Sequence, residues 1–463
     1  MRVQNSTSAA ALFLLVVQGN NAGWWCRTKT VNHPPRSAET ENPPPSAWRA
    51  WSWVPSLYFC QAVPYVAVVA LSVPMYKKLG ISNADLAFYT SWLYLPWVIK
   101  PLWSPLVDRF RTKRAWIVAL QFFVGAGLAA VALTVPGPDF FRWTLAVFWL
   151  LAFASATHDI AADGFYLLAL PPHQQAAFVG VRSTFYRLAN IAGQGGLVYL
   201  AGRLEVATGD VRAAWAWVFV PPAVFFALAA LYHLWVLPRP AGDGPVTDRS
   251  SLAVDWLVAF AAFFRKPGIA AILAFLLLYR LGEAQLVKLV QPFLLDDRAT
   301  GGLGLSTSQV GLIYGTYGII ALTVGGILGG LAIARYGLKR LLWPMLLCMH
   351  LPNLAYVWLA YAQPAAPGVI SLAVVVEQAG YGFGFTAFMV FMMLVADGAH
   401  KTAHYAICTG FMALGMMLPG MISGSIQAKL GYPHFFIWVC VATLPSIAAT
   451  ALIKVDPGFG KRA

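Results

Sequence analysis

RFRTKR at residues 109–114 returns as RYGLKR at residues 335–340, and this repeat decides the fold. A second matching pair, LGIS at 79–82 and LGLS at 303–306, lies shortly before the two copies. The two pairs are separated by nearly the same length of chain. Two matches at one separation indicate that the chain is built from two similar halves in the same orientation.

The composition places both halves in a membrane. Of 463 residues, 59% are hydrophobic and 11% are charged, which is too apolar for a soluble protein of this length. The 32 Lys and Arg residues outnumber the 18 Asp and Glu residues. Most of this surplus lies in loops on one side of the predicted membrane, so it indicates topology and not a nucleic-acid partner. The five cysteines are scattered, without the spacing of a disulfide framework or a metal site.

Twelve apolar runs are long enough to cross a bilayer. A hydrocarbon core about 30 Å thick needs about 20 residues of helix. We therefore predict an all-α membrane protein with twelve transmembrane helices, six in each half, and both termini in the cytoplasm. This is the plan of the major facilitator fold, in which substrate binds between the halves near the middle of the membrane. The runs lie near residues 50–76, 84–106, 115–135, 142–168, 177–201, 213–237, 268–294, 308–333, 341–361, 367–395, 403–427 and 432–453.

Polar segments divide the chain further. Before the first span we expect a Pro-rich disordered tail, or residues added by a start codon placed too early. The expected divisions are residues 1–48 for this tail, 49–238 for the N-terminal six-helix bundle, 239–266 for a cytoplasmic linker, 267–455 for the C-terminal bundle and 456–463 for a C-terminal tail. We expect a monomer.

Charged residues fall inside the predicted spans. They are Lys100, Asp159, Asp163, Arg182, Arg187, Arg280, Glu283, Lys288 and Glu377. A charge at the centre of a lipid-facing helix costs about 2.5–3.5 kcal/mol, so all of them together would cost roughly 20–30 kcal/mol. We therefore expect these side chains to face a cavity between the halves or to pair with one another.

Helical spacing groups several polar residues on shared faces. Asp159 and Asp163 are four residues apart, and Arg187, Asn190 and Gln194 form one stripe on the next span. The two neighbouring helices therefore offer a carboxylate face and a cationic, amide-bearing face. Together with the other span charges, this lining suits a substrate that carries carboxylates as well as hydroxyl and amide groups.

A structural alternative exists for some of these charges. An ion pair such as Asp163 with Arg187 would simply hold two helices together. Arg182 and Lys288 would lie close enough to the ends of their spans to reach water. Arg280 and Glu283 are spaced to pair with each other on the seventh span.

The pattern predicts roles in transport. Burial favours the neutral form of a carboxylate and a nearby cation favours the charged form, so a conformational change can move a proton. The proton-coupling candidates are Asp159, Asp163, Glu283 and Glu377. The substrate-binding candidates are Lys100, Arg187, Asn190, Gln194, Arg280 and Gln378.

The repeated loops supply candidates for a gate. Asp108, Arg109 and Arg114 belong to the first copy, and Arg335 and Arg340 to the second. These charges can bridge neighbouring helix ends and lock the outward-open state. The alternative is ordinary topological charge, which explains the Lys and Arg residues but not the repeat.

Signals for other chemistry are missing from the sequence. The chain has no phosphate-binding P-loop and no HExxH or GxSxG motif. His400 and His404 have a zinc-like spacing, but no third ligand accompanies them, so we expect solvated loop histidines. We expect no metal, no cofactor and no enzymatic activity.

From about residue 50 to 450 the chain resembles the AmpG-type muropeptide permeases, in the peptide/acetyl-coenzyme A transporter branch of the major facilitator superfamily. The resemblance rests on LPWVIKPLWSPLVDRF (95–110), HDIAADG (158–164), YRLANIAGQG (186–195), LYRLGEA (278–284), PFLL (292–295), VEQAGYGFG (376–384) and HYA (404–406). It implies proton-driven import, through the bacterial inner membrane, of N-acetylglucosamine joined to anhydro-N-acetylmuramic acid that carries a short peptide.

Several residues fall on polar positions of the family pattern, and some residues depart from the usual amino acid. The residues on polar positions are Lys100, Asp159, Asp163, Arg187, Glu283 and Glu377. His158 and His404 stand where the family usually has glutamine, Arg280 and Glu283 replace a usual Lys and Asp, and Gln378 replaces a usual Asn. An imidazole in place of an amide alters hydrogen bonding and adds a group that titrates near neutrality.

We therefore expect a proton-coupled secondary transporter that imports anhydro-muropeptides for cell-wall recycling. One rival is a transporter of another amphipathic anion, such as a siderophore, an acyl-coenzyme A or a drug-like compound. The other rival is a non-transporting membrane receptor or signal transducer that binds a ligand without accumulating it.

Overall fold

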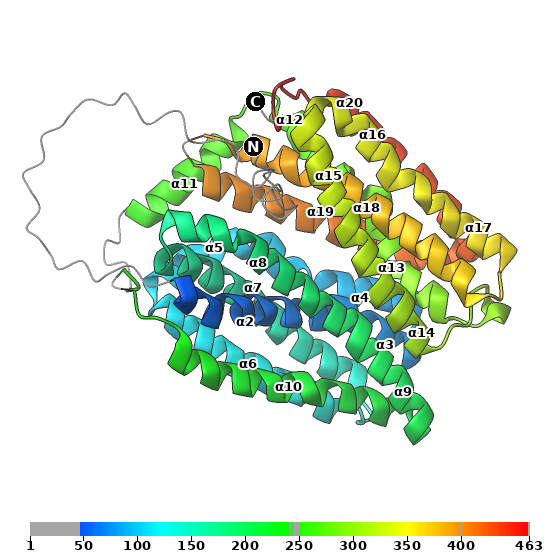
Figure 1. The fold of residues 1–463 in the computed structure, drawn as a ribbon. Helices are drawn as coiled ribbons and strands as arrows, with labels where there is room; N and C mark the ends of the chain where they lie inside the picture. The colour runs from blue at the N-terminus through cyan, green and yellow to red at the C-terminus, as the bar shows by residue number, and fades with distance from the viewer. Residues whose placement is uncertain (1–46, 241, 245–250, 399, 462–463) are drawn as a thin grey trace, which may run out of the picture.

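Helices make up almost all of the described chain. The computed structural model describes residues 47–240, 242–244, 251–398 and 400–461, and it contains no strand within those ranges. In Figure 1 the blue to green helices α2 to α10 lie together, and the yellow to red helices lie beside them. The predicted all-α fold is confirmed. The predicted tail falls outside the described residues except at its end, where α2 begins at Ala47.

We call α2 to α10 the N-terminal half and α11 to α20 the C-terminal half. The first contains α2 (Ala47–Val66), η1 (Ala67–Leu71), α3 (Ser72–Lys78), α4 (Asn83–Trp92), α5 (Leu95–Arg109), α6 (Lys113–Thr134), α7 (Phe140–Ala169), α8 (Pro172–Ile191), η2 (Ala192–Leu197), α9 (Val198–Thr208) and α10 (Val211–Val236). The second contains α11 (Ser251–Phe264), α12 (Ile269–Leu278), α13 (Leu281–Leu295), η3 (Arg298–Thr300), α14 (Thr307–Val310), η4 (Gly311–Gly318), α15 (Ile319–Tyr336), α16 (Leu338–His350), η5 (Leu351–Asn353), α17 (Leu354–Ala362), α18 (Pro367–Ala396), α19 (Lys401–Val441) and α20 (Leu444–Leu452).

Nine helical runs of the described chain are long and apolar enough to cross a membrane. One of them, Lys401–Leu452, covers two predicted spans, and its backbone breaks at Gly431, where φ is 70°. Two further predicted spans fall on α4 with α5 and on α8 with α9, which are interrupted and carry charges. Described helices therefore lie on all twelve predicted runs. The count of twelve spans and the orientation stay predictions.

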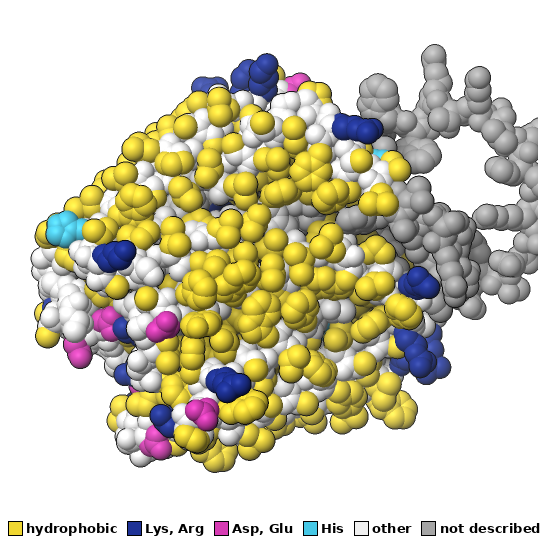
Figure 2. Space-filling view, turned by 180° about the vertical axis from the view of Figure 1, so that it is seen from behind, with side chains coloured by type: hydrophobic (Ala, Val, Ile, Leu, Met, Phe, Trp, Pro, Cys, Tyr) yellow, Lys and Arg dark blue, Asp and Glu magenta, His cyan; other side chains and the backbone are white. Residues whose placement is uncertain are grey.

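The outer surface is suited to lipid. Figure 2 shows hydrophobic side chains across the middle of one face, with Lys, Arg, Asp and Glu toward its edges. Large apolar side chains point outward on several helices, for example Leu133 at 81% exposure and Trp217 at 60%. An apolar surface of this extent is stable only when lipid covers it.

The LGIS and LGLS repeats have the same structural role. Gly80 and Gly304 both have a positive φ, 84° and 64°, which favours glycine because it lacks a Cβ. Ser82 and Ser306 then cap the helices that follow, and each side chain accepts a hydrogen bond from a backbone N–H three residues on. The sequence repeat therefore encodes the same turn and helix start in each half.

The RFRTKR and RYGLKR copies share a positive φ at one position. Arg111 and Gly337 occupy the same position of the two copies, and both have a positive φ, 65° and 82°. Each lies at the turn between a helix that ends there and the next one that begins. The loops differ in length, because Phe110–Thr112 separates the helices in the first copy and Gly337 alone separates them in the second.

Polar contacts join the two halves at one end of the molecule. Lys77 Nζ lies 2.6 Å from Asp296 Oδ1, and the Tyr432 hydroxyl donates to Asp296 Oδ2 at 2.6 Å. Asn83 Nδ2 donates to Gln427 Oε1 and lies within hydrogen-bond distance of Tyr432 Oη, both at 2.9 Å. These five residues come from segments far apart in the sequence and tie the halves together.

A second group of contacts lies at the same end. Thr307 Oγ1 donates to Glu205 Oε2 at 2.7 Å, which joins the C-terminal to the N-terminal half. Trp215 Nε1 donates to Glu205 Oε1 at 3.0 Å, and Lys78 Nζ lies 3.6 Å from Oε2. We call this end, defined by Lys77, Glu205, Asp296 and Thr307, the latch end.

Glycines bring the backbones of the halves into contact beside the latch. A Cβ added at Gly202 would lie 2.9 Å from Ser308 Cα, and one added at Gly311 would lie 2.9 Å from the Gly195 carbonyl oxygen. Only glycine permits so close an approach. Gly195 and Gly311 belong to η2 and η4, two π-helical segments that contact each other across the halves.

Candidate functional site

A cavity of about 900 Å³ lies between the halves. Helices α2, α5, α7 and α8 line it on one side, and α13, α15, α18 and α19 on the other. Most of the predicted site residues face it: Lys100, Asp159, Asp163, Arg187, Asn190, Gln194, Arg280 and Gln378. At the end opposite the latch, the cavity reaches Lys113, Leu167 and Thr402, which lie at helix ends.

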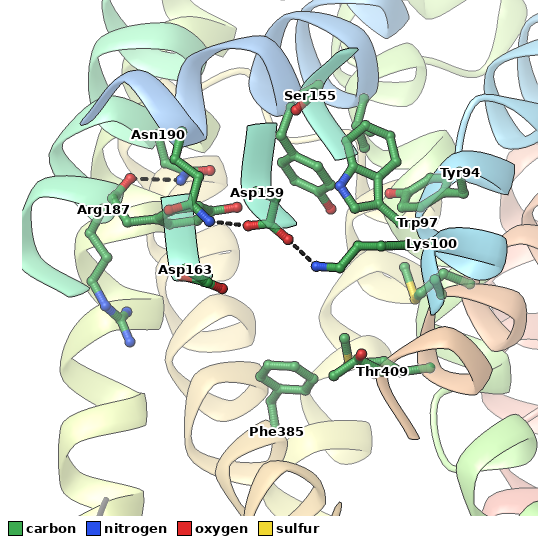
Figure 3. A pocket seen from close by; sticks show the side chains of 18 of the residues that line it. Tyr94, Trp97, Lys100, Ser155, Asp159, Asp163, Arg187, Asn190, Phe385 and Thr409 are labelled. Atoms are coloured by element: carbon green, nitrogen blue, oxygen red, sulfur yellow. Dashed lines mark hydrogen bonds and ion pairs between the residues drawn. The ribbon is translucent and has the colours of Figure 1, made fainter. Parts of the chain in front are cut away.

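Asp159 stands at the centre of this cavity (Figure 3). Its carboxylate forms an ion pair with Lys100 of α5 and accepts a hydrogen bond from Gln61 of α2. The side chains of Asp159 and Lys100 are 22% and 23% exposed, so the pair meets the cavity and not lipid. Gln61 had a detectable signal, because it is a polar residue in an apolar span, but no charged residue accompanies it in the predicted span 50–76.

Asp163 lies one turn along α7, and its partner is not the predicted one. Arg182 Nη2 lies 2.6 Å from Asp163 Oδ1, and the Tyr58 hydroxyl donates to the same oxygen at 3.1 Å. The pairing of Asp163 with Arg187 was wrong. Arg182 also lies over the Tyr58 and Tyr166 rings, 4.2 and 4.5 Å from their centroids, so it does not extend to a span end.

Three cavity cations have no carboxylate partner among the described residues. Arg187 Nη1 donates to Thr323 Oγ1 of α15 at 3.0 Å and so links the two halves. Arg280 donates to the Tyr381 hydroxyl and lies 4.7 Å from the centroid of the Phe385 ring. The third is Lys288, which lies in the middle of α13 and is 3% exposed, so it does not extend to a span end as the structural alternative required.

Glu283 and Glu377 do not line the cavity. The span charges were expected to face the cavity or to pair with one another, and the first alternative does not hold for Glu283 and Glu377, which are fully buried in the C-terminal half. Glu377 Oε2 accepts hydrogen bonds from Tyr356 at 3.1 Å and from Gln378 at 2.9 Å. Neither oxygen of Glu283 has a described hydrogen-bond partner, and the expected Arg280–Glu283 pair is absent from the described ion pairs.

Amide and aromatic groups complete the lining. Asn190 Nδ2 donates to the Tyr186 carbonyl at 2.9 Å, which leaves its side-chain oxygen toward Gln194 at 3.5 Å. Tyr65 and Trp97 pack edge to face with ring centroids 5.1 Å apart, and both line the cavity. Aromatic residues are common throughout this sequence, so the pattern alone did not single these two out.

Among the described side chains, the predicted gating residues form no hydrogen bond or ion pair between the halves. Arg114 Nε donates to the Leu237 carbonyl at 3.2 Å and Nη2 donates to Leu234, within the N-terminal half. Arg109, Arg335 and Arg340 lie over the rings of nearby aromatic residues in their own loops. Asp108 lies in α5, and its side chain is outside the described part of the chain.

The two departures at histidine are both buried. His158 is 1% exposed and contacts Gln121 at 3.2 Å, and Gln121 Oε1 accepts from His233 Nδ1 at 2.8 Å. His404 is 4% exposed and donates from Nε2 to the Ala259 carbonyl at 3.0 Å. The prediction of a solvated His404 was therefore wrong. The described residues contain no group of three or more metal-ligating side chains.

Comparison with known proteins places this arrangement in context. A sequence model described as the Major Facilitator Superfamily matches residues 56–291. The chain is 27% identical over 381 residues to the "Anhydromuropeptide permease" of Escherichia coli (strain K12), which covers 80% of this chain and 73% of that protein.

Two solved structures have the same fold. A D-xylose-proton symporter superposes with a TM-score of 0.70 at 15% identity and covers 90% of this chain and 100% of that one. A POT family transporter in complex with 5-aminolevulinic acid superposes with a TM-score of 0.66 at 13% identity and covers 87% of this chain and 96% of that one.

Proposed function

This chain belongs to the Major Facilitator Superfamily, and on that premise we propose that it imports anhydro-muropeptides together with protons. It is a multi-pass transporter of the bacterial inner membrane. The relative from Escherichia coli is named as an anhydromuropeptide permease, which supports this substrate class. Lys100, Asp159 and Arg187, which match the family pattern, lie together in the cavity.

One observation carries the choice of substrate class. Arg187 and Arg280 face the cavity without carboxylate partners, whereas the two cavity carboxylates, Asp159 and Asp163, each have a cation of their own. The lining therefore has cations to spare, and an anionic ligand would satisfy them through charge-assisted hydrogen bonds. A peptide stem with carboxylates supplies such groups.

The remaining lining suits the sugar and peptide parts of the same molecule. Asn190 and Gln194 offer amides for hydroxyl and N-acetyl groups. Tyr65 and Trp97 present ring surfaces against which the apolar face of a sugar can pack. A pocket of this volume lies within the range that encloses ligands of several hundred daltons.

Transport then follows from alternating access. In the predicted orientation the latch end faces the periplasm, so the structure corresponds to a cavity closed outward and open to the cytoplasm. Substrate would enter after the latch contacts of Lys77 and Glu205 separate, and it would leave past Lys113 and Thr402. The paired loops 109–114 and 335–340 would meet when that second end closes.

We assign the coupling proton to Glu283. A buried carboxylate without hydrogen bonds is stable only as the neutral acid, because an unpaired charge away from water is costly. Arg280 is three residues away on α13, so an ionised Glu283 would draw the Arg280 guanidinium toward itself. Protonation of Glu283 would leave Arg280 for the substrate carboxylate, which couples the proton to binding. Glu377, Asp159 and Asp163 stay secondary candidates.

The test is uptake of radiolabelled N-acetylglucosaminyl-anhydro-N-acetylmuramyl tripeptide into proteoliposomes, with and without an imposed proton gradient. We expect accumulation only with the gradient, and competition by unlabelled muropeptide but not by an acyl-coenzyme A or a siderophore. Accumulation that these compounds suppress would favour the other anion class. Binding without accumulation at any gradient would favour a receptor.

A further inference from the structure

The middle of α13 lines the cavity, and so does Arg280 at its N-cap. Val287, Lys288 and Gln291 border the opening, and their spacing places them on one side of the helix. Lys288 lies about 12 Å along the axis from Arg280 and about 12 Å from the latch residue Asp296. The face therefore continues from the centre of the cavity toward the closed end.

Lys288 is a buried cation with donors to spare. Its Nζ donates to Thr90 Oγ1 at 3.0 Å and lies 5.1 Å from the centroid of the Tyr94 ring. The Thr90 hydroxyl itself donates to the Leu86 carbonyl at 2.7 Å, so its lone pairs are directed to the ammonium group. An ammonium has three N–H groups, and one neutral hydroxyl is weak compensation for a charge that is 3% exposed.

Gln291 supplies the complementary group one turn further on. Its side chain is 6% exposed, and its Oε1 has no described hydrogen-bond partner. The Lys288 ammonium group can bind a ligand carboxylate, and Gln291 Oε1 on the next turn can accept a hydrogen bond from a ligand N–H group. The two residues therefore suit a carboxylate that lies beside an N–H group. That combination occurs at the C-terminal residue of a peptide, whose carboxylate lies beside its own N–H group.

We propose that Lys288 and Gln291 form a second carboxylate subsite, nearer the latch end than Arg280, which receives the acidic end of the peptide stem. The subsite rests on the proposed anionic substrate. Neither residue was assigned a binding role from the sequence, and Lys288 was expected to be able to reach water.

The partners of Lys288 explain how such a subsite would be used. Thr90 and Tyr94 belong to the N-terminal half and Lys288 to the C-terminal half, so opening the latch end separates them. The freed ammonium is then available to an incoming carboxylate. When the latch end closes again, the Thr90 hydroxyl competes for the same donor and favours release. A ligand shifts a conformational equilibrium only through such a difference in contacts.

The first experiment separates charge from shape at Lys288. Uptake of labelled muropeptide by Lys288→Gln and Lys288→Arg is compared with the exposed control Lys429→Gln, with a substrate whose peptide carboxylates are free or amidated. For Lys288→Gln we expect the KM to rise about tenfold to a hundredfold, as for a lost hydrogen bond to a charged group, with the maximal rate little changed. Lys288→Arg should keep a KM close to that of the wild type.

The effect of amidation on the KM distinguishes a binding role of Lys288 from a structural role. Amidation should raise the KM of the wild type by a larger factor than that of Lys288→Gln, because Arg187 and Arg280 lose their carboxylates in both proteins but the Lys288 contact is already lost in the variant. An unchanged KM in Lys288→Gln, or an amidation penalty of equal size in both proteins, would overturn the subsite. Size-exclusion profiles of the purified variants check that they fold.

A second experiment works without muropeptide transport. Membrane-impermeant sulfo-N-hydroxysuccinimide acetate is added to the periplasmic side, and modification of Lys288 is mapped by mass spectrometry, with γ-glutamyl-diaminopimelate as the protecting ligand. We expect faster modification in Thr90→Val and protection by γ-glutamyl-diaminopimelate, which carries three carboxylates. If wild-type uptake fails but protection is seen, the proposed function falls and the subsite stands. Absence of modification or of protection removes the subsite, whatever uptake shows.

Discussion

Lys77 Nζ lies 2.6 Å from Asp296 Oδ1, and this ion pair crosses between the two halves of the molecule. The side chains are 16% and 18% exposed, so the pair is partly shielded from water. Asp296 also accepts a hydrogen bond from Tyr432 at 2.6 Å. Removing either charge would leave the other without its ion-pair partner. We therefore expect the loss of either charge to destabilise the closed latch end.

Asp296→Asn is expected to shift the protein toward the state that is open at the latch end. A partly exposed ion pair contributes about 1 kcal/mol, which corresponds to roughly a fivefold change in population. The measurement is labelling of Val73→Cys, a cavity residue, by an impermeant thiol reagent from the latch side, in a background without the native cysteines. Equal labelling rates with Asp296 and with Asn would show that the pair does not hold the end closed.

Gly202→Ala should block closure of the same end. Its added Cβ would lie 2.9 Å from Ser308 Cα, too close for the backbones to stay in place. We expect uptake to fall at least about tenfold, because a clash of more than 1.4 kcal/mol disfavours the closed state by that factor. Gly196→Ala is the matched control, since its Cβ would meet nothing within 4 Å. Similar uptake by both variants would contradict the packing argument.

Asp163→Asn is expected to abolish uphill uptake of muropeptide. The substitution removes the carboxylate that holds Arg182 at 2.6 Å and leaves that guanidinium unpaired beside the cavity. Asp163→Glu keeps the charge and should retain part of the activity. Normal accumulation in the asparagine variant, measured with an imposed proton gradient, would remove Asp163 from the mechanism.

Glu283→Gln should separate binding from proton coupling. The amide imitates the neutral acid, so Arg280 stays available to substrate and exchange across the membrane continues. Accumulation driven by a proton gradient should disappear, and the exchange rate should no longer depend on pH. The check is counterflow and gradient-driven uptake in the same proteoliposomes at several pH values. Gradient-driven accumulation in this variant would show that Glu283 does not carry the coupling proton, and it would favour Glu377, Asp159 or Asp163 in that role.

The sequence predicted the features that depend on local conformation. The repeats at 79–82 and 303–306 could be recognised in the sequence. In the structure each contains a glycine with a positive φ, followed by a serine that caps the next helix. The all-α fold and the polar lining followed from composition and helical spacing. Such features need only a few neighbouring residues, which the sequence supplies in full.

Pairings between helices were predicted less well. Asp163 lies six residues before the end of α7 at Ala169, whereas Arg182 and Arg187 lie ten and fifteen residues after the start of α8 at Pro172. The register of this antiparallel pair therefore favours Arg182 over the more distant Arg187 as the partner of Asp163. The burial of Glu283 behind the cavity wall could not be read in the same way, because it depends on the rotation and tilt of α13 against its neighbours.

The π-helical segments η1, η2 and η4 give the last consequence. Each turn of such a segment contains about one residue more than a regular turn, so it changes the angular phase of everything beyond it by roughly 100°. In η2 this phase shift lets Gln194 border the cavity while Gly202 meets Ser308 beyond it. Deleting one residue from Ala192–Leu197 would restore regular winding and turn Gly202 away from its contact, so this protein should tolerate substitution there better than a change in length.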